Sequence, residues 1–436
     1  MSDITIKNAL ILTQNSRREV FEKDVRIEGN RIAEVGKNLS KSGYVIDAKG
    51  KLLIPGLVNT HCHAYMAMLR GYAEDMEVEK WLSEKVWPIE AIMVKDKKAG
   101  KLGTHLSCLE MIRSGVTAFA DMTMYSDSTV PSAVKEVGMR GFLGYGMADL
   151  GNKQRIESEL KGTEKFISAI KEQKTDRIKP VISPHSVYTC SEETLKKTIE
   201  LSEKYKAPMQ IHCAETRKEV YDCKKRTGKR PLDYLKSIGM LKPETILAHC
   251  VWLTKAEINT LAGAGASVSY NPTSNLKLAS GGLSPVPEML EAGVNVSLGT
   301  DGPASNNSLN IFFEMKIGSL VQKNFRWNPE VMPAQSMFDM ATLNGGMAFG
   351  YKNSIEKGNP ADLVLLERGP GMTPLYDPML SLVYSKQYVQ TTIIDGEIVM
   401  ENMEIKTLNE QKLLAEAQEV GMRLVAQKTK KMRDIK

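Results

Sequence analysis

LLIPGLVNTHCH, residues 52–63, is an apolar run that ends in two histidines. Side chains two positions apart on a strand face the same side, so His61 and His63 could present two imidazoles to one ion. An isolated pair of this kind is weak evidence. Its position directly after a strand-like run, with Pro55-Gly56 behind it, makes a metal centre the favoured interpretation.

Other potential metal ligands also stand at the ends of apolar, strand-like runs. The runs are IKPVISPH ending at His185, APMQIH at His212, ETILAH at His249 and NVSLGTD at Asp301. Imidazole and carboxylate groups at the carboxyl ends of barrel strands are what a barrel enzyme uses to hold a catalytic cation. We therefore expect these side chains to meet at one mouth of a barrel.

Strand-like runs alternate with helical stretches from about Leu57 onward, which predicts βα units and a parallel sheet. Eight such units over roughly 300 residues fit a (β/α)8 barrel of the TIM type. The eight runs centre on Val58, Ala118, Phe142, Val181, Gln210, Ile246, Val268 and Val296.

The chain ends have a different pattern from the middle. Residues 1–56 contain short β-like runs separated by turns, residues 57–350 carry the predicted catalytic barrel, and β character returns in residues 351–436 before a helical stretch from Leu408 to Lys431. The economical interpretation is one small β-sandwich module built from both ends, with two separate small domains as the alternative.

Composition restricts the class of protein. The chain has 436 residues, 42% hydrophobic and 25% charged, with a net charge of +6. The charges are mixed in sign along the chain, which argues against nucleic-acid binding. No apolar run is long enough to cross a bilayer, and the N-terminus lacks the features of an export signal. We expect a cytoplasmic protein with no membrane partner.

The six cysteines show no CxxC pairing, so thiolate-zinc and dithiol redox sites are not indicated. Cys62 and Cys213 adjoin histidines, and alternation along a strand would point them away from the barrel interior. We interpret the cysteines as small buried hydrophobic residues in a reducing cytoplasm.

Asp301, at the end of the eighth run, would face His61 and His63 across the barrel mouth, although an Asp at such a turn is often only a helix N-cap. Three imidazoles and one carboxylate leave an open position for water, as a catalytic zinc site requires. One Zn2+ per subunit is the expected cofactor, with Fe2+ or Mn2+ as alternatives.

Three further residues have both a structural and a catalytic interpretation. Glu215 follows His212 and could be a helix-start carboxylate, but a site of this kind needs a proton carrier. His185 and His249 would each, taken alone, be ordinary core histidines. Their shared position at strand ends favours a role in the site. His105 lies in a helical pattern and is expected to be structural.

The segments PGLVNTHCH, HCAE, LAHC and LGTDG resemble the amidohydrolase superfamily in its nucleobase-deaminase branch, over essentially the whole chain. The fourth run ends in Pro184-His185 without a lysine, so a two-metal site bridged by a carboxylated lysine is not indicated. Trp81, Glu90, PHSVY, HCAET, YNPTSNLKLASG and LGTDGPASNNSLNIFFEM are similar to the 5′-methylthioadenosine/S-adenosylhomocysteine deaminases and 5′-deoxyadenosine deaminases.

The resemblance implies a role for each matching residue. His61, His63, His212 and Asp301 would bind the metal, and Glu215, His249 and Asp301 would be catalytic. The substrate-binding set would be Glu90 on the ribose hydroxyls, His185 and Ser305 on the purine, Trp81 on the sugar side, and Arg155 near the 5′ group, together with Glu215 and Asp301. The resemblance also implies a small-molecule nucleoside substrate and a homo-oligomer, either a dimer or a tetramer.

One departure from the family pattern concerns the 5′ substituent. Relatives that accept S-adenosylhomocysteine carry two arginines for its carboxylate; the first is replaced here by Tyr145, and the second corresponds to Arg155. Loss of a bidentate carboxylate clamp shifts the expectation toward neutral 5′ groups, with S-adenosylhomocysteine tolerated. The alternatives are guanine or cytosine deamination, triazine dechlorination, and a non-catalytic scaffold.

Overall fold

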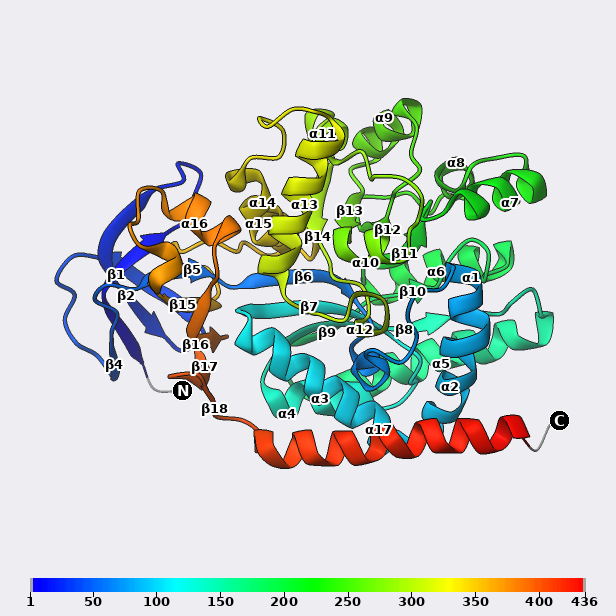
Figure 1. The fold of residues 1–436 in the computed structure, drawn as a ribbon, viewed down its shortest axis with the longest axis horizontal. Helices are drawn as coiled ribbons and strands as arrows, with labels where there is room; N and C mark the ends of the chain where they lie inside the picture. Colours follow the sequence, from blue (N-terminus) through cyan, green and yellow to red (C-terminus); the bar gives the residue numbers. More distant parts are fainter. Residues whose placement is uncertain (1–2, 434–436) are drawn as a thin grey trace.

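The computed structural model describes residues 3–433 and contains a β-rich module beside a barrel (Figure 1). The module is one nine-stranded sheet in the order β18-β17-β16-β15-β5-β1-β2-β3, with β4 paired to β1. Its strands are β1 (Ile4–Leu12), β2 (Val20–Glu28), β3 (Arg31–Gly36), β4 (Tyr44–Asp47), β5 (Leu52–Pro55), β15 (Leu363–Glu367), β16 (Tyr388–Ile394), β17 (Glu397–Glu401) and β18 (Glu404–Ile405). Strand β5 pairs with both β1 and β15, so the two chain ends share one sheet.

The barrel strands run parallel to one another wherever they pair, as the alternating pattern predicted. They are β6 (Leu57–Cys62), β7 (Val116–Thr123), β8 (Arg140–Met147), β9 (Ile178–Pro180) with β10 (Ser183–Pro184), β11 (Met209–Cys213), β12 (Thr245–His249), β13 (Ser267–Tyr270) and β14 (Asn295–Leu298). Bridges from Ile182 to Met209 and from Ser186 to His212 join the two halves. The (β/α)8 prediction is therefore confirmed.

The barrel closes where its first and last strands meet. The backbone N–H of Asp301 donates to the carbonyl of His61 at 3.0 Å, and the Thr60 hydroxyl donates to the carbonyl of Leu298 at 2.9 Å. This closure brings the residues after β14 next to the end of β6.

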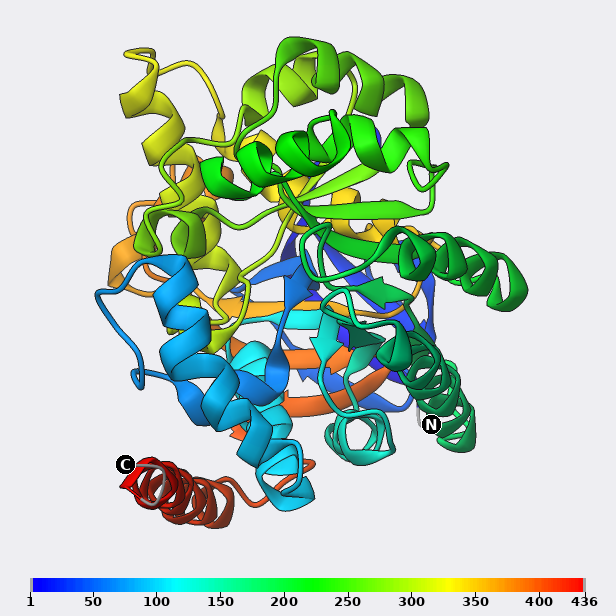
Figure 2. The same ribbon diagram turned by 90° about the vertical axis from the view of Figure 1, so that its right-hand side faces the viewer.

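Helices surround the barrel in both views (Figures 1 and 2). The helices of residues 3–433 are η1 (Ala64–Leu69), α1 (Val78–Lys80), η2 (Trp81–Val86, a π-helical turn), α2 (Trp87–Met93), α3 (Lys97–Arg113), α4 (Thr129–Val137), α5 (Lys153–Glu172), α6 (Glu192–Tyr205), α7 (Arg217–Thr227), α8 (Pro231–Ser237), α9 (Lys255–Ala264), α10 (Pro272–Lys277), α11 (Val286–Glu291), α12 (Pro303–Asn306), α13 (Ile311–Phe325), α14 (Ala334–Ala341), α15 (Leu343–Ala348), η3 (Pro370–Met372), α16 (Pro378–Tyr384) and α17 (Glu410–Arg433).

The last helix, α17, lies along α3 and α2 (Figure 2, where it is seen end-on). It buries Leu413, Val420 and Leu424 at helical spacing, so an apolar stripe holds it to the body. The ammonium of Lys428 donates to the carbonyl of Glu84 at 3.0 Å. The helix thereby contacts the segment that follows the first barrel strand.

Gly56 alone separates the module strand β5 from the barrel strand β6. Its N–H donates to the carbonyl of Asp362 at 2.9 Å, and a Cβ at this position would collide with the side chain of Thr117. Only glycine lets the backbone pass so close to its neighbours. Ion pairs from Arg140 and Arg177 of the barrel to Asp395 of the module also join the two parts.

Among residues 3–433, no helix is both long and apolar enough to cross a membrane.

Candidate metal centre

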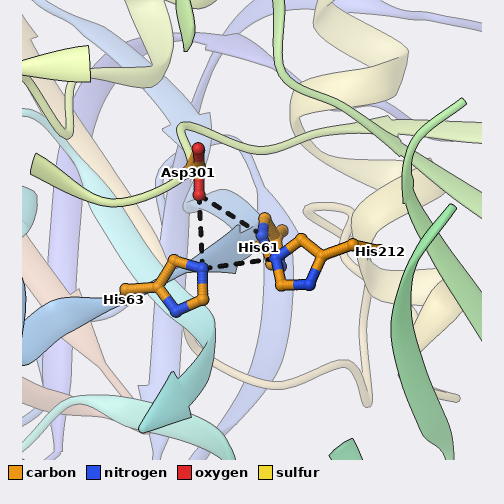
Figure 3. Close-up of side chains that lie close together, drawn as sticks. All are labelled: His61, His63, His212 and Asp301. Carbon is orange, nitrogen blue, oxygen red and sulfur yellow. Dashed lines mark hydrogen bonds and ion pairs between the residues drawn. The ribbon is translucent and has the colours of Figure 1, made fainter. Parts of the chain in front are cut away.

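Four side chains from three strand ends converge at the barrel mouth (Figure 3). His61 lies near the end of β6 and His63 directly follows that strand, while His212 lies on β11 and Asp301 follows β14. One ligand atom from each lies within 4.8 Å of the others, and all four side chains are buried. The structure thus brings together the four side chains that the sequence analysis assigned to a metal.

Hydrogen bonds fix the tautomers of two of these histidines. Nδ1 of His63 lies 2.8 Å from the carbonyl of Met122, and Nδ1 of His212 lies 2.6 Å from the carbonyl of His185. A carbonyl only accepts, so each Nδ1 carries the proton and donates it. When the ring is neutral, each Nε2 keeps a free lone pair, which is the form of imidazole that binds a metal. The Nε2 atoms of His63 and His212 lie 3.4 Å apart.

The third histidine is oriented by a side-chain amide. The amide nitrogen of Gln210 donates to the carbonyl of Thr60 at 2.8 Å, which turns its oxygen toward Nδ1 of His61 at 3.2 Å. Nε2 of His61 is buried and forms no hydrogen bond among residues 3–433, and Oδ1 of Asp301 lies 3.5 Å from it. A buried nitrogen without a partner is costly, and a cation at this point would satisfy it. The four residues therefore fit a metal ion.

Asp301 divides its two oxygens between the cluster and two hydroxyls. Oδ1 lies 3.3 Å from Nε2 of His63, while Oδ2 accepts from Ser274 and Ser305, each at 2.7 Å. Burial opposes ionisation, yet contacts with His61 and His63 hold the pKa of Asp301 well below its usual range. Asp301 in turn raises the pKa of His63 to about 9 against the opposite effect of burial, so this position attracts positive charge.

Glu215 and His249 stand beside the cluster. Nε2 of His249 lies 3.9 Å from a carboxylate oxygen of Glu215. Nδ1 of His249 lies 2.9 Å from the amide nitrogen of Asn275, so it accepts and the ring proton sits on Nε2. Burial lowers the pKa of His249 to about 4, and the ring is neutral at pH 7. His249 can therefore donate a hydrogen bond toward Glu215 and the cavity.

A cavity of about 350 Å³ opens above these residues. Ten of the eleven side chains assigned to the site from sequence line it, and the eleventh, His61, is fully buried. The ten are His63, Trp81, Glu90, Arg155, His185, His212, Glu215, His249, Asp301 and Ser305. Most of the remaining wall is apolar, including Leu82, Met124 and Leu278.

The segment between β6 and α3 supplies the side of this cavity that carries Glu90. The hydroxyl of Tyr65 donates to Glu90, and burial raises the pKa of the Glu90 carboxyl. Trp81, on the π-helical turn, donates from Nε1 to the carbonyl of Ala73 at 3.1 Å. Both side chains are thus held in place before any substrate binds.

His185 lies on another part of the wall. Its Nδ1 is 3.1 Å from the hydroxyl of Thr189, and burial together with the neighbouring imidazoles lowers its pKa to about 3. It is therefore neutral at pH 7 and can take part in hydrogen bonds without carrying charge.

Among residues 3–433, Arg155 is the one lysine or arginine that lines the cavity. Its guanidinium lies 3.2 Å from Glu159, whose other oxygen accepts from the N–H of Ala148 at 3.2 Å. Tyr145 also hydrogen-bonds to Glu159, and burial, with Glu159, raises its pKa. The carboxylate of Glu159 therefore partly neutralises the positive charge of Arg155.

Several supporting residues were not predicted from the sequence. Gln210 orients His61, and Tyr65 holds Glu90. Ser274 orients Asp301. Asn275 orients His249. The one available signal was the position of Gln210, two residues before His212 on the same strand, which places both side chains on the same face.

Comparison with known proteins agrees with this geometry. The Amidohydrolase family profile matches residues 52–399, and the chain belongs to this family. The 5′-deoxyadenosine deaminase of Methanosarcina mazei is 43% identical over 98% of this chain and 99% of its own. The 5-methylthioadenosine/S-adenosylhomocysteine deaminase of Pyrococcus furiosus is 42% identical over 94% of this chain and 98% of its own. Among solved structures, an adenosine deaminase from Xanthomonas campestris with bound zinc has a TM-score of 0.89 at 28% identity. The match covers 98% of this chain and 99% of that chain.

Proposed function

We propose that this chain is a metal-dependent hydrolytic deaminase that converts 5′-modified adenosines to the inosine analogues and releases ammonia. The observation that carries the proposal is the convergence of three imidazoles and the Asp301 carboxylate beside Glu215 at one cavity. The names of the relatives that match nearly the whole chain support the substrate class, which comprises 5′-deoxyadenosine, 5′-methylthioadenosine, S-adenosylhomocysteine and adenosine.

The cluster of His61, His63, His212 and Asp301 would hold the metal, with Zn2+ as the proposed ion and Fe2+ or Mn2+ as alternatives. A divalent cation held there would lower the pKa of a water molecule toward about 7 and so supply a nucleophile at neutral pH. The bound zinc in the similar adenosine deaminase structure supports this choice of ion.

The side chains around the cluster can carry out the proton transfers. Water adds to C6 of the purine, Glu215 gives a proton to ring N1, and Asp301 accepts the proton that the water loses. The low pKa of Asp301 keeps its carboxylate ionised before that step. His249, a neutral Nε2–H donor, stabilises negative charge on the added oxygen. The proton held by Asp301 then passes to the amine as the C6–N bond breaks, the C6 hydroxyl returns a proton to Glu215, and ammonia leaves.

The remaining cavity residues would bind the nucleoside. Glu90, already held by Tyr65, would accept from the ribose hydroxyls, and Trp81 would cover the sugar. His185 and Ser305 would contact the purine. Ser305 also donates to Asp301, so its hydroxyl would connect purine binding with the carboxylate that accepts the proton from water.

The 5′ group would lie near Arg155 and the apolar wall. Because Glu159 opposes the charge of Arg155, the site favours a neutral 5′ substituent over the charged homocysteinyl group, which is tolerated.

The six cysteines are free and buried, which supports a reducing compartment, and we propose the cytoplasm. The proposed assembly is a homo-oligomer, a dimer or a tetramer.

A substrate panel tests the function and its alternatives together. The zinc-loaded protein is incubated with 5′-deoxyadenosine, adenosine, guanine, cytosine and a chlorinated triazine while ammonia and chloride release are followed. The proposal requires ammonia from the adenosines at the highest kcat/KM. A preference for guanine, cytosine or the triazine would overturn it. Elemental analysis that finds no metal after purification with zinc would favour a non-catalytic scaffold.

A further inference from the structure

Two successive βα units of the barrel begin their helices with the same pattern, a threonine followed three residues later by a glutamate. In α9 the pair forms a capping box: Thr254 accepts from the N–H of Glu257 at 3.3 Å, and Glu257 accepts from the N–H of Thr254 at 2.8 Å. In α7, Thr216 accepts from the N–H of Glu219 at 3.1 Å. The carboxylate of Glu219, however, has different partners.

Glu219 reaches past the helix start into the turn that follows β11. One of its oxygens accepts from the N–H of Ala214 at 2.9 Å and the other from the N–H of Glu215 at 2.7 Å. The side chain is buried, with 5% of the residue exposed. Both oxygens of Glu219 are therefore used by the two residues that lead from the metal-ligand strand to the helix.

The turn held by Glu219 contains a strained residue. Ala214 has a φ of +51°, in the left-handed region that residues with a Cβ avoid. Its carbonyl accepts from the N–H of Trp252 at 2.9 Å, so the turn is also tied to the next unit. A non-glycine residue persists in this conformation only where surrounding contacts impose it. The two hydrogen bonds to Glu219 are contacts of that kind.

We propose that Glu219 is a positioning residue for Glu215: it holds the Ala214 turn in its left-handed form and so directs the Glu215 carboxylate into the cavity beside His249. The inference rests on the proposed function, in which Glu215 transfers the proton. Helix capping alone does not account for the arrangement, because Thr216 already caps α7 and Glu219 binds N–H groups outside the helix.

The test combines a loss with a specific rescue. In Glu219→Gln, the remaining side-chain oxygen can accept from one of the two N–H groups. The new amide NH2 faces the other N–H group, and because both are donors that hydrogen bond is lost. A misplacement of about 1 Å can cost on the order of 100-fold in rate, so we expect kcat for 5′-deoxyadenosine to fall about 30- to 100-fold. We expect KM to change less than about twofold and the zinc content per chain to stay at the wild-type level, because neither the nucleoside contacts nor the ligands are altered.

Glycine at position 214 adopts the left-handed conformation without strain. Adding Ala214→Gly to Glu219→Gln should therefore restore kcat about tenfold or more, which a loss of helix stability would not allow. Glu219→Asp, whose shorter side chain cannot reach both N–H groups, is measured in parallel with the same rescue in case the glutamine variant does not fold. Glu257→Gln, which loses a capping-box carboxylate in the neighbouring unit, is the matched control and should change kcat less than about threefold.

A kcat within twofold of wild type in both Glu219 variants, absence of rescue by Ala214→Gly, or an equal loss in Glu257→Gln would each overturn the inference. Crystal structures of the variants give a readout independent of turnover, in which the Glu215 carboxylate should be displaced in Glu219→Gln and restored in the double variant. If the wild-type protein released no ammonia from any adenosine, the proposed function would fail, while these structures would still test the role of Glu219.

Discussion

Nδ1 of His61 lies 3.2 Å from the side-chain oxygen of Gln210, and this contact determines which nitrogen of His61 faces His63, His212 and Asp301. Replacement of Gln210 by leucine removes the acceptor and frees the ring to rotate or change tautomer. Loss of such a partner typically lowers metal affinity 10- to 100-fold, and we expect a decrease of about that size for zinc. Competition with a chromophoric chelator measures the affinity.

The control for that variant is Gln322→Leu. Gln322 is also fully buried and hydrogen-bonded, but to the carbonyl of Ser284. The Gln322→Leu variant should destabilise the fold without changing the affinity for zinc. Equal affinities in wild type and Gln210→Leu would show that Gln210 does not orient His61.

Glu215→Gln should keep the metal and lose most of its turnover. The amide can occupy the same space but cannot give a proton to the purine, and general acid–base catalysis is worth about 100- to 10,000-fold. Ammonia release gives kcat, and elemental analysis gives the zinc content. Turnover near the wild-type rate would remove Glu215 from the mechanism.

Glu90 should discriminate between ribose and 2′-deoxyribose. A buried carboxylate that lacks its hydroxyl donor is left unpaired, so we expect kcat/KM for 2′,5′-dideoxyadenosine to be at least about 100-fold below that for 5′-deoxyadenosine. Glu90→Gln should lower kcat/KM for the ribonucleoside and narrow the ratio between the two. Equal rates with the two sugars in the wild-type protein would contradict this role.

Glu159→Gln should shift the preference for the 5′ group. Once the opposing charge is removed, Arg155 can attract the carboxylate of S-adenosylhomocysteine, and a partly exposed pair of this kind changes affinity by about 1 kcal/mol, or roughly fivefold. The ratio of kcat/KM for S-adenosylhomocysteine to that for 5′-deoxyadenosine should rise accordingly. Glu157→Gln, on the same helix but paired with Lys161 at the surface, is the control that changes net charge equally. The same rise in both variants would indicate a general charge effect.

Asp395 links the β-rich module to the barrel and should make stability depend on pH. Its two oxygens lie 3.0 Å from Arg140 and 3.0 Å from Arg177. Burial raises its pKa, but the two guanidinium groups outweigh burial and hold it below the ordinary 3.8. Because the folded pKa is depressed, the stabilisation is complete above the unfolded pKa and is lost as pH falls through the folded pKa.

Asp395→Asn should therefore cost about 2 kcal/mol of unfolding free energy at pH 7, and the difference from wild type should shrink as pH drops below about 4. Urea denaturation at a series of pH values measures it. Asp222→Asn, at an exposed helical pair with Lys218, should cost less than about 0.5 kcal/mol. A difference for Asp395→Asn that is the same at pH 3 and pH 7 would contradict this assignment.

The sequence was most informative where chemistry and local periodicity coincide. His61, His63, His212 and Asp301 each end an apolar run, and parallel strands place such ends at one mouth of a barrel, so their convergence was predictable. The joining of both chain ends in one sheet was also predictable from the return of short β-like runs after the barrel.

The supporting contacts were not predictable, because they join residues far apart in the chain. Gln210 and His61 are 149 positions apart, and Ser274 and Asp301 are 27 apart. Tyr65 and Glu90 lie in a segment of short helices with a π-helical turn, for which local propensity gives no packing direction. Glu219 matches the pattern of an ordinary capping box, and only the three-dimensional structure reveals that it reaches the Ala214 turn instead.

The single-residue junction at Gly56 also affects how this protein could be divided or recombined. Strand β5 before it and strand β6 after it are consecutive, and the glycine N–H donates to the carbonyl of Asp362, which directly precedes β15. At this junction there is no linker at which a protein engineer could separate the barrel from its terminal sheet. A graft at this boundary would disturb the strand that presents His61 and His63, so the two parts are expected to be inherited and engineered as one piece.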